Sequence, residues 1–287
     1  GWMNTFIIYV ALPALFFQLL AKTPFERLTE WSFIFGAVFS TYLIFAAMFV
    51  GSIVMGGRIA ESTIKALSAA YGNIGYMGPG LALLAFGDEA AVPVALIFCF
   101  ENIMHFAMAP AMMALSGDDR SPPLMLALGV VRKIALHPFI ISTFIGVAAA
   151  YFEFRPPLPA ERLLEYLARA AAPCALFAMG VTLALRPLNR VPAEMAPIAV
   201  LKLVVHPLLC WVVLSWVGNF SPEWVYSAVL LAALPTATNV FVIAQQYNVW
   251  VQRASASVLI TTAASVGTVT GLIYLIKSGM LPPDLFP

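Results

Sequence analysis

The sequence has little charge. Only 10% of its 287 residues are Asp, Glu, Lys or Arg, and the formal net charge is +1. About a quarter of the residues in ordinary soluble domains are charged, so this chain falls outside that class. Without a basic surface it has nothing with which to hold the phosphates of a nucleic acid, and we expect no nucleic-acid partner.

Signatures of enzymes and metal sites are missing too. The chain contains no HExxH motif, no GxSxG elbow, no P-loop and no pair of intramembrane aspartates. Its three cysteines, Cys99, Cys174 and Cys210, lie singly inside apolar runs, without the spacing of a metal or redox site. We therefore expect no enzyme, no metal site and no cofactor.

Hydrophobic sequence extends along the whole chain instead, and 62% of the residues are hydrophobic. Runs of roughly 20 apolar residues, the length that crosses a bilayer, recur nine times. This predicts an all-α polytopic protein embedded in the lipid bilayer of the cell membrane. The predicted spans are 3–20, 31–54, 61–87, 90–115, 124–151, 163–185, 195–217, 222–247 and 254–277.

Two of these spans are interrupted in the middle. Residues 70–80 contain four glycines and a proline, and residues 234–239 read Leu-Pro-Thr-Ala-Thr-Asn. Inside a helix glycine costs about 1 kcal/mol and proline about 3 kcal/mol. An unpaired backbone group in lipid costs several kcal/mol more, so both breaks must be buried in protein or line a cavity. Interrupted spans in corresponding places indicate a transporter binding site made of discontinuous helices.

The two halves of the chain resemble each other. Residues 11–17 are similar to residues 171–177, and Pro13 and Pro173 lie 160 residues apart, about the offset between the two breaks. Spans one to four then repeat as spans six to nine. Two repeats of five helices, the first helix being absent before span one, explain this pattern and make the topology inverted. The expected parts are a first repeat at 1–115 with its broken helix at 61–87, a linker at 116–123, and a second repeat at 124–287 with its broken helix at 222–247.

The breaks are the first candidates for binding. The N-terminus of a half-helix carries about half a positive charge, and its free N–H groups favour an anion. The expected contacts of such an anion are Gly72, Asn73, Gly75 and Tyr76 in the first break, and Pro235, Thr236, Thr238 and Asn239 in the second. The alternative is that these side chains only cap the broken helices, with Tyr76 as a packing residue.

Ionisable and amide side chains at membrane depth are the second set of candidates. Glu101, Asn102 and His105 lie in the fourth span, and Lys202 lies in the seventh, four residues before His206. A carboxylate at this depth costs roughly 2.5–3.5 kcal/mol, so it should face the interior of the bundle. We interpret Glu101, Asn102, His105 and Lys202 as candidates for coupling to Na⁺ or a proton. The alternatives are a neutralised Glu101–His105 pair, which share a helical face, and a snorkelling or structural Lys202.

The motif Gly72-Asn73-x-Gly75-Tyr76-Met77-Gly78 resembles the auxin efflux carrier family in its bacterial branch, which includes malonate or malate permease-like proteins. Residues 11–15, 172–180 and 234–247 match further landmarks of that family in order, so the resemblance covers essentially the whole chain. It implies ten helices as five plus five, with two crossed broken helices. It also implies a scaffold domain and a transport domain with an elevator motion, in a fold related to bile-acid/sodium symporters.

The resemblance also implies roles for single residues. Asn73 matches the crossover asparagine that meets the substrate carboxylate in plant relatives. Pro235 matches the proline of the second crossing, and Asn239 an asparagine common in bacterial members. One departure is that Asn248 follows Tyr247, near where bacterial relatives often carry an acidic residue.

Together these features predict a secondary active carrier of a small organic anion, a carboxylate, by alternating access around the crossed helices. Two alternatives stay open. One is a sodium-coupled symporter of a larger amphipathic anion such as a bile-acid-like molecule, and the other is a sensor that binds a carboxylate without moving it. The sequence leaves open the substrate, the coupling ion, the direction of transport and whether the chain forms a homodimer.

Overall fold

The computed structural model describes residues 2–117, 128–129, 131–132, 135–136, 138–185 and 192–285. Within these ranges the chain is helical, and its β-structure is limited to one isolated bridge between Gly72 and Thr236. The predicted all-α fold is confirmed. The predicted linker at 116–123 lies outside the described residues from 118 onward, as does the first part of the span predicted at 124–151.

Long apolar helices account for four of the predicted spans. In the described part of the chain, four helical stretches have the length and composition needed to cross a membrane. They are Phe25–Val54, Asp88–Leu115, Met195–Val217 and Val251–Lys277. Within them lie η2 (Phe25–Thr29), α3 (Trp31–Val54), η3 (Asp88–Ala90), α6 (Ala91–Leu115), α10 (Met195–Val200), η4 (Leu201–Val205), α11 (His206–Val217) and α14 (Val251–Lys277).

The two interrupted spans are broken where the sequence predicts. The first consists of α4 (Ile59–Ala70) and α5 (Gly78–Phe86), and the second of α12 (Pro222–Ala233) and α13 (Thr238–Tyr247). Pro79 stands in the first turn of α5, where its missing N–H removes no helical hydrogen bond. Each half-helix is too short to cross a bilayer alone.

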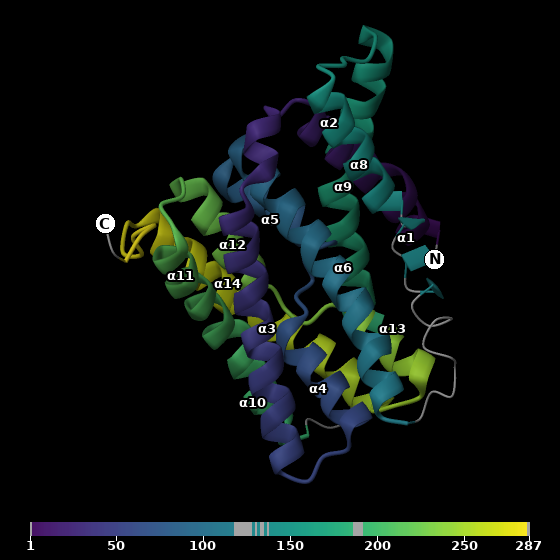
Figure 1. Cartoon of the computed structure of the whole chain (residues 1–287), viewed down its shortest axis with the longest axis vertical. Helices are drawn as coiled ribbons and strands as arrows, with labels where there is room; N and C mark the ends of the chain where they lie inside the picture. Colours follow the sequence, from purple (N-terminus) through teal and green to yellow (C-terminus); the bar gives the residue numbers. More distant parts are fainter. Residues whose placement is uncertain are drawn as a thin grey trace.

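The helices form two groups (Figure 1). The first, which we call the three-helix bundle, packs the continuous run of α1 (Trp2–Phe6), η1 (Ile7–Ala11) and α2 (Leu12–Ala21) against α8 (Pro138–Tyr151) and α9 (Leu158–Leu185). The second, the crossed-helix bundle, contains α3 to α6 and α10 to α14. In both halves of the crossed-helix bundle a long helix, a broken helix and a long helix follow one another. Whether an inverted symmetry relates these halves stays a prediction.

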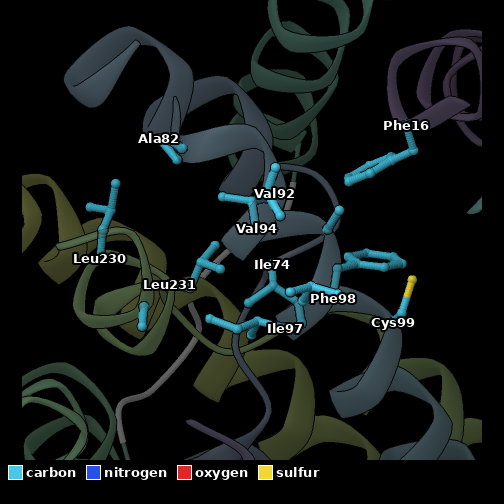
Figure 2. Close-up of a cluster of buried hydrophobic side chains, with 14 of the residues drawn as sticks. Phe16, Ile74, Ala82, Val92, Val94, Ile97, Phe98, Cys99, Leu230 and Leu231 are labelled. Atoms are coloured by element: carbon cyan, nitrogen blue, oxygen red, sulfur yellow. The ribbon is translucent and has the colours of Figure 1, made fainter. Parts of the chain in front are cut away.

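Apolar side chains fill the space where the two bundles meet. Figure 2 shows Phe16 of α2 reaching toward Phe98 of α6, with Ile74 of the first break and Leu231 of α12 nearby. The rings of Phe16 and Phe98 lie 5.7 Å apart between centroids. This packing fixes the first break between α6 and α12 on one side and positions it close to α2.

Candidate functional site

The two breaks pair with each other. The backbone N–H of Asn73 donates to the carbonyl of Pro235 at 2.7 Å, and the N–H of Ala237 donates to the carbonyl of Tyr71 at 2.9 Å. These two bonds flank the antiparallel bridge between Gly72 and Thr236. Each break thus satisfies backbone groups of the other, which is the requirement for unwound chain inside a membrane protein.

Thr236 bonds the paired breaks to α4 and α14. Its hydroxyl donates to the carbonyl of Ser68 at 2.6 Å, one of the carbonyls left free at the end of α4, and its N–H donates to Thr261 Oγ1 at 3.0 Å. Thr261 in turn donates to the carbonyl of Ser257 on its own helix, α14. The hydroxyl and the N–H of Thr236 and the carbonyl of Pro235 are therefore used inside the protein.

Gly72 and Gly75 are required because neighbouring groups lie very close to their backbone. A Cβ on Gly72 would lie 3.2 Å from the carbonyl oxygen of Leu231 and 3.2 Å from Lys202 Nζ. A Cβ on Gly75 would lie only 2.8 Å from the ring of Phe98. The glycines of the first break therefore let α12, α6 and the Lys202 side chain come within contact distance of the backbone.

A small cavity of about 70 Å³ lies at this pairing, and we call it the crossing cavity. It is bordered by the two breaks, by α6, and by Ile8 and Leu12 of the three-helix bundle. Of the eight residues predicted to contact the anion, those that line it are Gly72, Asn73, Gly75, Tyr76, Thr238 and Asn239. Pro235 and Thr236 lie behind it, in the pairing itself. The remaining lining residues are Tyr71, Phe98, Asn102, Phe106 and Ala237.

Tyr71 joins the polar side chains of the cavity. Its hydroxyl donates to Asn102 Oδ1 at 2.5 Å and accepts a bond of 2.8 Å from Asn239 Nδ2. Asn102 also donates to the carbonyl of Phe98 at 2.8 Å. The sequence reading did not single out Tyr71, because a tyrosine beside a helix break looks like a packing residue. Its position directly before Gly72 is the signal that could have found it.

The cavity combines polar and apolar side chains and has no Asp, Glu, Lys, Arg or His among its described lining residues. One helix N-terminus opens into the cavity, that of α13, whose first residues Thr238 and Asn239 line it. Its partial positive charge and free N–H groups, with the amide donors of the asparagines, give the cavity the character of an anion site. Within the described residues, no group of three or more His, Cys, Asp or Glu side chains is placed to hold a metal ion.

Of the four candidates for ion coupling, Asn102 lines the cavity, and Glu101, His105 and Lys202 do not. Glu101 accepts a hydrogen bond of 2.6 Å from the hydroxyl of Thr41 on α3. His105 contacts Tyr42 at 3.1 Å through Nδ1 and stacks on Tyr71 at 4.0 Å between ring centroids. Each thus has its own partner on another helix, and the alternative of a Glu101–His105 pair is not what the structure contains.

Lys202 is fully buried, so the snorkelling alternative is wrong. It stands in η4, a π-helical turn, and its Nζ donates to the carbonyl of Ala232 at 2.7 Å. The same atom lies 2.8 Å from His206 Nδ1. His206 and Thr41, which the sequence reading did not propose as site residues, are therefore part of the polar interior.

A larger cavity of about 790 Å³ lies farther along the same seam, between α2, α9 and α5. Leu12 borders the crossing cavity and Leu15, one turn later on α2, borders the large cavity, so the two cavities are neighbours along this helix. Phe98 borders the crossing cavity and packs on Phe16 of α2. At its outer end Lys22 forms an ion pair of 2.8 Å with Glu161. Hydrogen bonding to Lys22, with its positive charge, lowers the pKa of the Glu161 carboxyl.

Two broken helices that pair at a small polar cavity inside a helical membrane protein are the construction of a secondary transporter. Comparison with known proteins names the family. The chain belongs to the membrane transport protein family, the auxin efflux carriers, whose model matches residues 2–273. The resemblance noted from the sequence motifs is confirmed, and the chain is a multi-pass membrane transporter rather than an enzyme.

Individual relatives agree with the family. The chain is 63% identical over 288 residues to a protein of Rhizobium meliloti (strain 1021) that bears the name "Putative malonate transporter", covering 100% of this chain and 90% of the relative. It is 26% identical over 219 residues to the uncharacterized transporter YfdV of Escherichia coli (strain K12), covering 75% of this chain and 68% of the relative. An uncharacterized transporter of Methanothermobacter thermautotrophicus is 23% identical over 270 residues, 92% of this chain and 85% of the relative.

Proposed function

We propose that this transporter is a secondary carrier of a small organic carboxylate, which binds in the crossing cavity. Asn73, Thr238 and Asn239 would contact the carboxylate oxygens, with Tyr71 holding the Asn239 amide in place. The observation that carries the proposal is the cavity itself, where the N-terminus of α13 and neutral side-chain donors converge. A carboxylate has the charge and the acceptor oxygens that such donors recognise.

The size of the cavity favours a small substrate. About 70 Å³ accommodates on the order of five water-sized spheres, which corresponds to a molecule of a few heavy atoms. A bile-acid-like anion is far larger, so the alternative of a symporter for amphipathic anions loses support. The name of the Rhizobium meliloti relative points to malonate, a dicarboxylate of this size. Malonate is therefore the first substrate to test.

The arrangement of the two bundles supports alternating access. The crossing cavity is bordered by the broken helices on one side and by Ile8 and Leu12 of the three-helix bundle on the other. The backbone bonds between the breaks tie α4, α5, α12 and α13 into one unit. We propose that this unit slides along α2 and α9, with the large cavity as the access route on one side of the membrane.

Two measurements test the proposal on the purified protein. The first is thermal stability against malonate, malate, succinate, acetate and a bile acid. A ligand at about 100 times its Kd adds roughly 2.7 kcal/mol of stability, which is visible as a raised melting temperature. We expect malonate to stabilise the protein and the bile acid to leave it unchanged.

The second measurement is uptake of radiolabelled malonate into proteoliposomes. Saturable uptake is expected, competed by the carboxylates that stabilise the protein. Binding without uptake would favour the sensor alternative, and the absence of both binding and uptake for every carboxylate would overturn the proposal. Asn219→Ala, on an exposed loop, is the control variant and should behave as the unmodified protein.

A further inference from the structure

Behind the crossing cavity lies a continuous chain of four buried polar side chains. Its members come from α3, α6, η4 and α11, and each is at most 5% exposed. They are Glu101, Thr41, His206 and Lys202. Burying an acid and a base away from water is costly, and such groups in a membrane protein usually serve an ion or proton path.

The chain is hydrogen-bonded from end to end. Lys202 Nζ lies 2.8 Å from His206 Nδ1, His206 Nε2 lies 3.0 Å from Thr41 Oγ1, and the Thr41 hydroxyl donates to Glu101 Oε1 at 2.6 Å. Because an ammonium can only donate, His206 Nδ1 accepts and its Nε2–H donates to Thr41. All three bonds therefore point from Lys202 toward Glu101, the arrangement that lets a proton pass along a chain.

Lys202 also supplies a fixed positive charge at the end of α12. Its ammonium binds the carbonyl of Ala232, in the last turn of α12, where the negative end of the helix dipole favours a cation. The ammonium is also close to the first break, since a Cβ on Gly72 would lie 3.2 Å from Nζ. The protein thus provides its own cation at this carbonyl.

The other titratable groups near this hydrogen-bonded chain contact partners outside it or lie at other places in the fold. Tyr42 contacts His105, Tyr71 binds Asn102 and Asn239, and Cys210 lies on α11 one turn after His206.

The charged side chains of α4 and α14 that pack nearest form a separate ionic cluster with the residue before α10. In it Lys65 lies 2.7 Å from Glu61 and 3.3 Å from Glu194, and Arg253 lies 2.8 Å from Glu194. Glu223 is in the first turn of α12, at the opposite end from Ala232.

We propose that the Lys202–His206–Thr41–Glu101 chain is the coupling site of the carrier and that its coupling ion is a proton, one per substrate molecule. The inference rests on the proposed function. Transfer along the chain breaks one N–H bond of the Lys202 ammonium and forms Nδ1–H on His206. The Nε2–H bond of His206 is replaced by a new O–H bond on Thr41, and the former Thr41 proton bonds to Glu101. Each electron pair stays on the atom that loses its proton, so no oxidant or reductant is needed.

Such a transfer removes both buried charges at once, leaving a neutral amine and a carboxylic acid. A dianion arriving in the crossing cavity, next to Asn102, places negative charge beside Glu101 and favours uptake of one further proton by the chain. The loaded state then carries an ammonium and a carboxylic acid with the substrate. When the substrate leaves on the other side of the membrane, that proton is released there too.

The decisive experiment measures protons and malonate together. Purified full-length protein is titrated with malonate by calorimetry in buffers of different ionisation enthalpy, in choline salts without Na⁺. About one proton taken up per malonate bound is expected. In proteoliposomes, an inward pH gradient without Na⁺ should drive malonate accumulation, followed together with internal pH by an entrapped dye.

Variants at Thr41 cut the chain without removing a charged group. Thr41→Val is expected to lower pH-driven accumulation at least tenfold while malonate–malonate exchange falls much less, and Thr41→Ser should restore accumulation. Thr262→Val is the matched control, because this buried hydroxyl on α14 donates to the carbonyl of Val258 on its own helix. It should accumulate malonate normally.

The outcomes separate this inference from the proposed function. Malonate binding by the unmodified protein without proton uptake overturns the inference alone, and this holds even if Thr41→Val does not fold. Accumulation driven by a Na⁺ gradient at equal pH, or full pH-driven accumulation by folded Thr41→Val, also overturns it. Failure of the unmodified protein to bind or move any carboxylate of the panel overturns the proposed function and the inference with it.

Discussion

Asn239 Nδ2 donates a hydrogen bond of 2.8 Å to Tyr71 Oη. The first turn of the half-helix α13 is thereby bonded to the residue directly after the half-helix α4. Tyr71 follows α4, and Asn239 is the second residue of α13. The same hydroxyl donates to Asn102 on α6. One tyrosine thus fixes two amide side chains of the crossing cavity and connects three helices.

Removing this hydroxyl should loosen the protein. Tyr71→Phe leaves the Asn239 amide and the Asn102 carbonyl oxygen without their buried partner, and a buried polar group left unpaired costs about 1–3 kcal/mol. We expect a lower melting temperature in detergent and weaker malonate binding. Tyr274→Phe is the control, since Tyr274 is 63% exposed. Equal melting temperatures for the two variants would show that the Tyr71 hydroxyl has no structural role.

Asn73 is expected to contribute directly to affinity. Asn73→Ala removes side-chain donors from the crossing cavity but keeps the backbone N–H that bonds to Pro235. Hydrogen bonds to a charged group contribute about 1.5–3 kcal/mol, so the Kd for malonate should rise tenfold or more. The measurement is titration of the folded variant by thermal shift or calorimetry. Unchanged affinity would remove the Asn73 side chain from the site.

Glycine at position 75 should be needed for the shape of the cavity. In Gly75→Ala the new methyl would meet the Phe98 ring at 2.8 Å, so the ring must shift, and it lines the cavity. We predict a malonate Kd at least several-fold higher. Gly267→Ala provides the comparison, because a Cβ there has no neighbour within 4 Å and alanine favours the helix by about 1 kcal/mol. It should be as stable as the unmodified protein or more so, with the same affinity.

The ring of Phe98 is expected to set the size of the substrate. Phe98→Leu shortens a side chain that borders the crossing cavity and packs on Phe16 of α2. Bulkier carboxylates such as phenylmalonate should then gain affinity relative to malonate, as measured by competition against labelled malonate. Phe35→Ala, at a side chain that is 65% exposed, serves as the control. An unchanged ratio of the two affinities would mean that Phe98 does not limit the site.

The sequence predicts the helices of this protein well because the bilayer imposes simple rules. Apolar runs of fixed length mark the spans, and the glycines and prolines at 72–80 and at Pro235 mark the breaks. The same chemistry points to six of the thirteen lining residues of the crossing cavity, since a break with a polar side chain has few other uses in lipid.

The partners of the buried groups could not be predicted in the same way. Glu101 and His105 share a helical face, which suggests a pair, yet Glu101 bonds to Thr41 and His105 to Tyr42 on α3. Which helix packs against that face is a tertiary property that spacing along one helix does not contain. Lys202 likewise resembles a snorkelling lysine until η4 and α12 are seen side by side.

The pairing of the two breaks also has a consequence for how the protein is made. The residues that it joins, such as Tyr71 and Asn239, are 168 positions apart. At about 5–20 residues per second, a ribosome adds that much chain in roughly 10–30 s. During this interval the first broken helix is in the membrane while its backbone groups await partners that do not yet exist. We therefore expect the nascent first half to need a temporary partner, such as the insertion machinery or water, until the second half arrives.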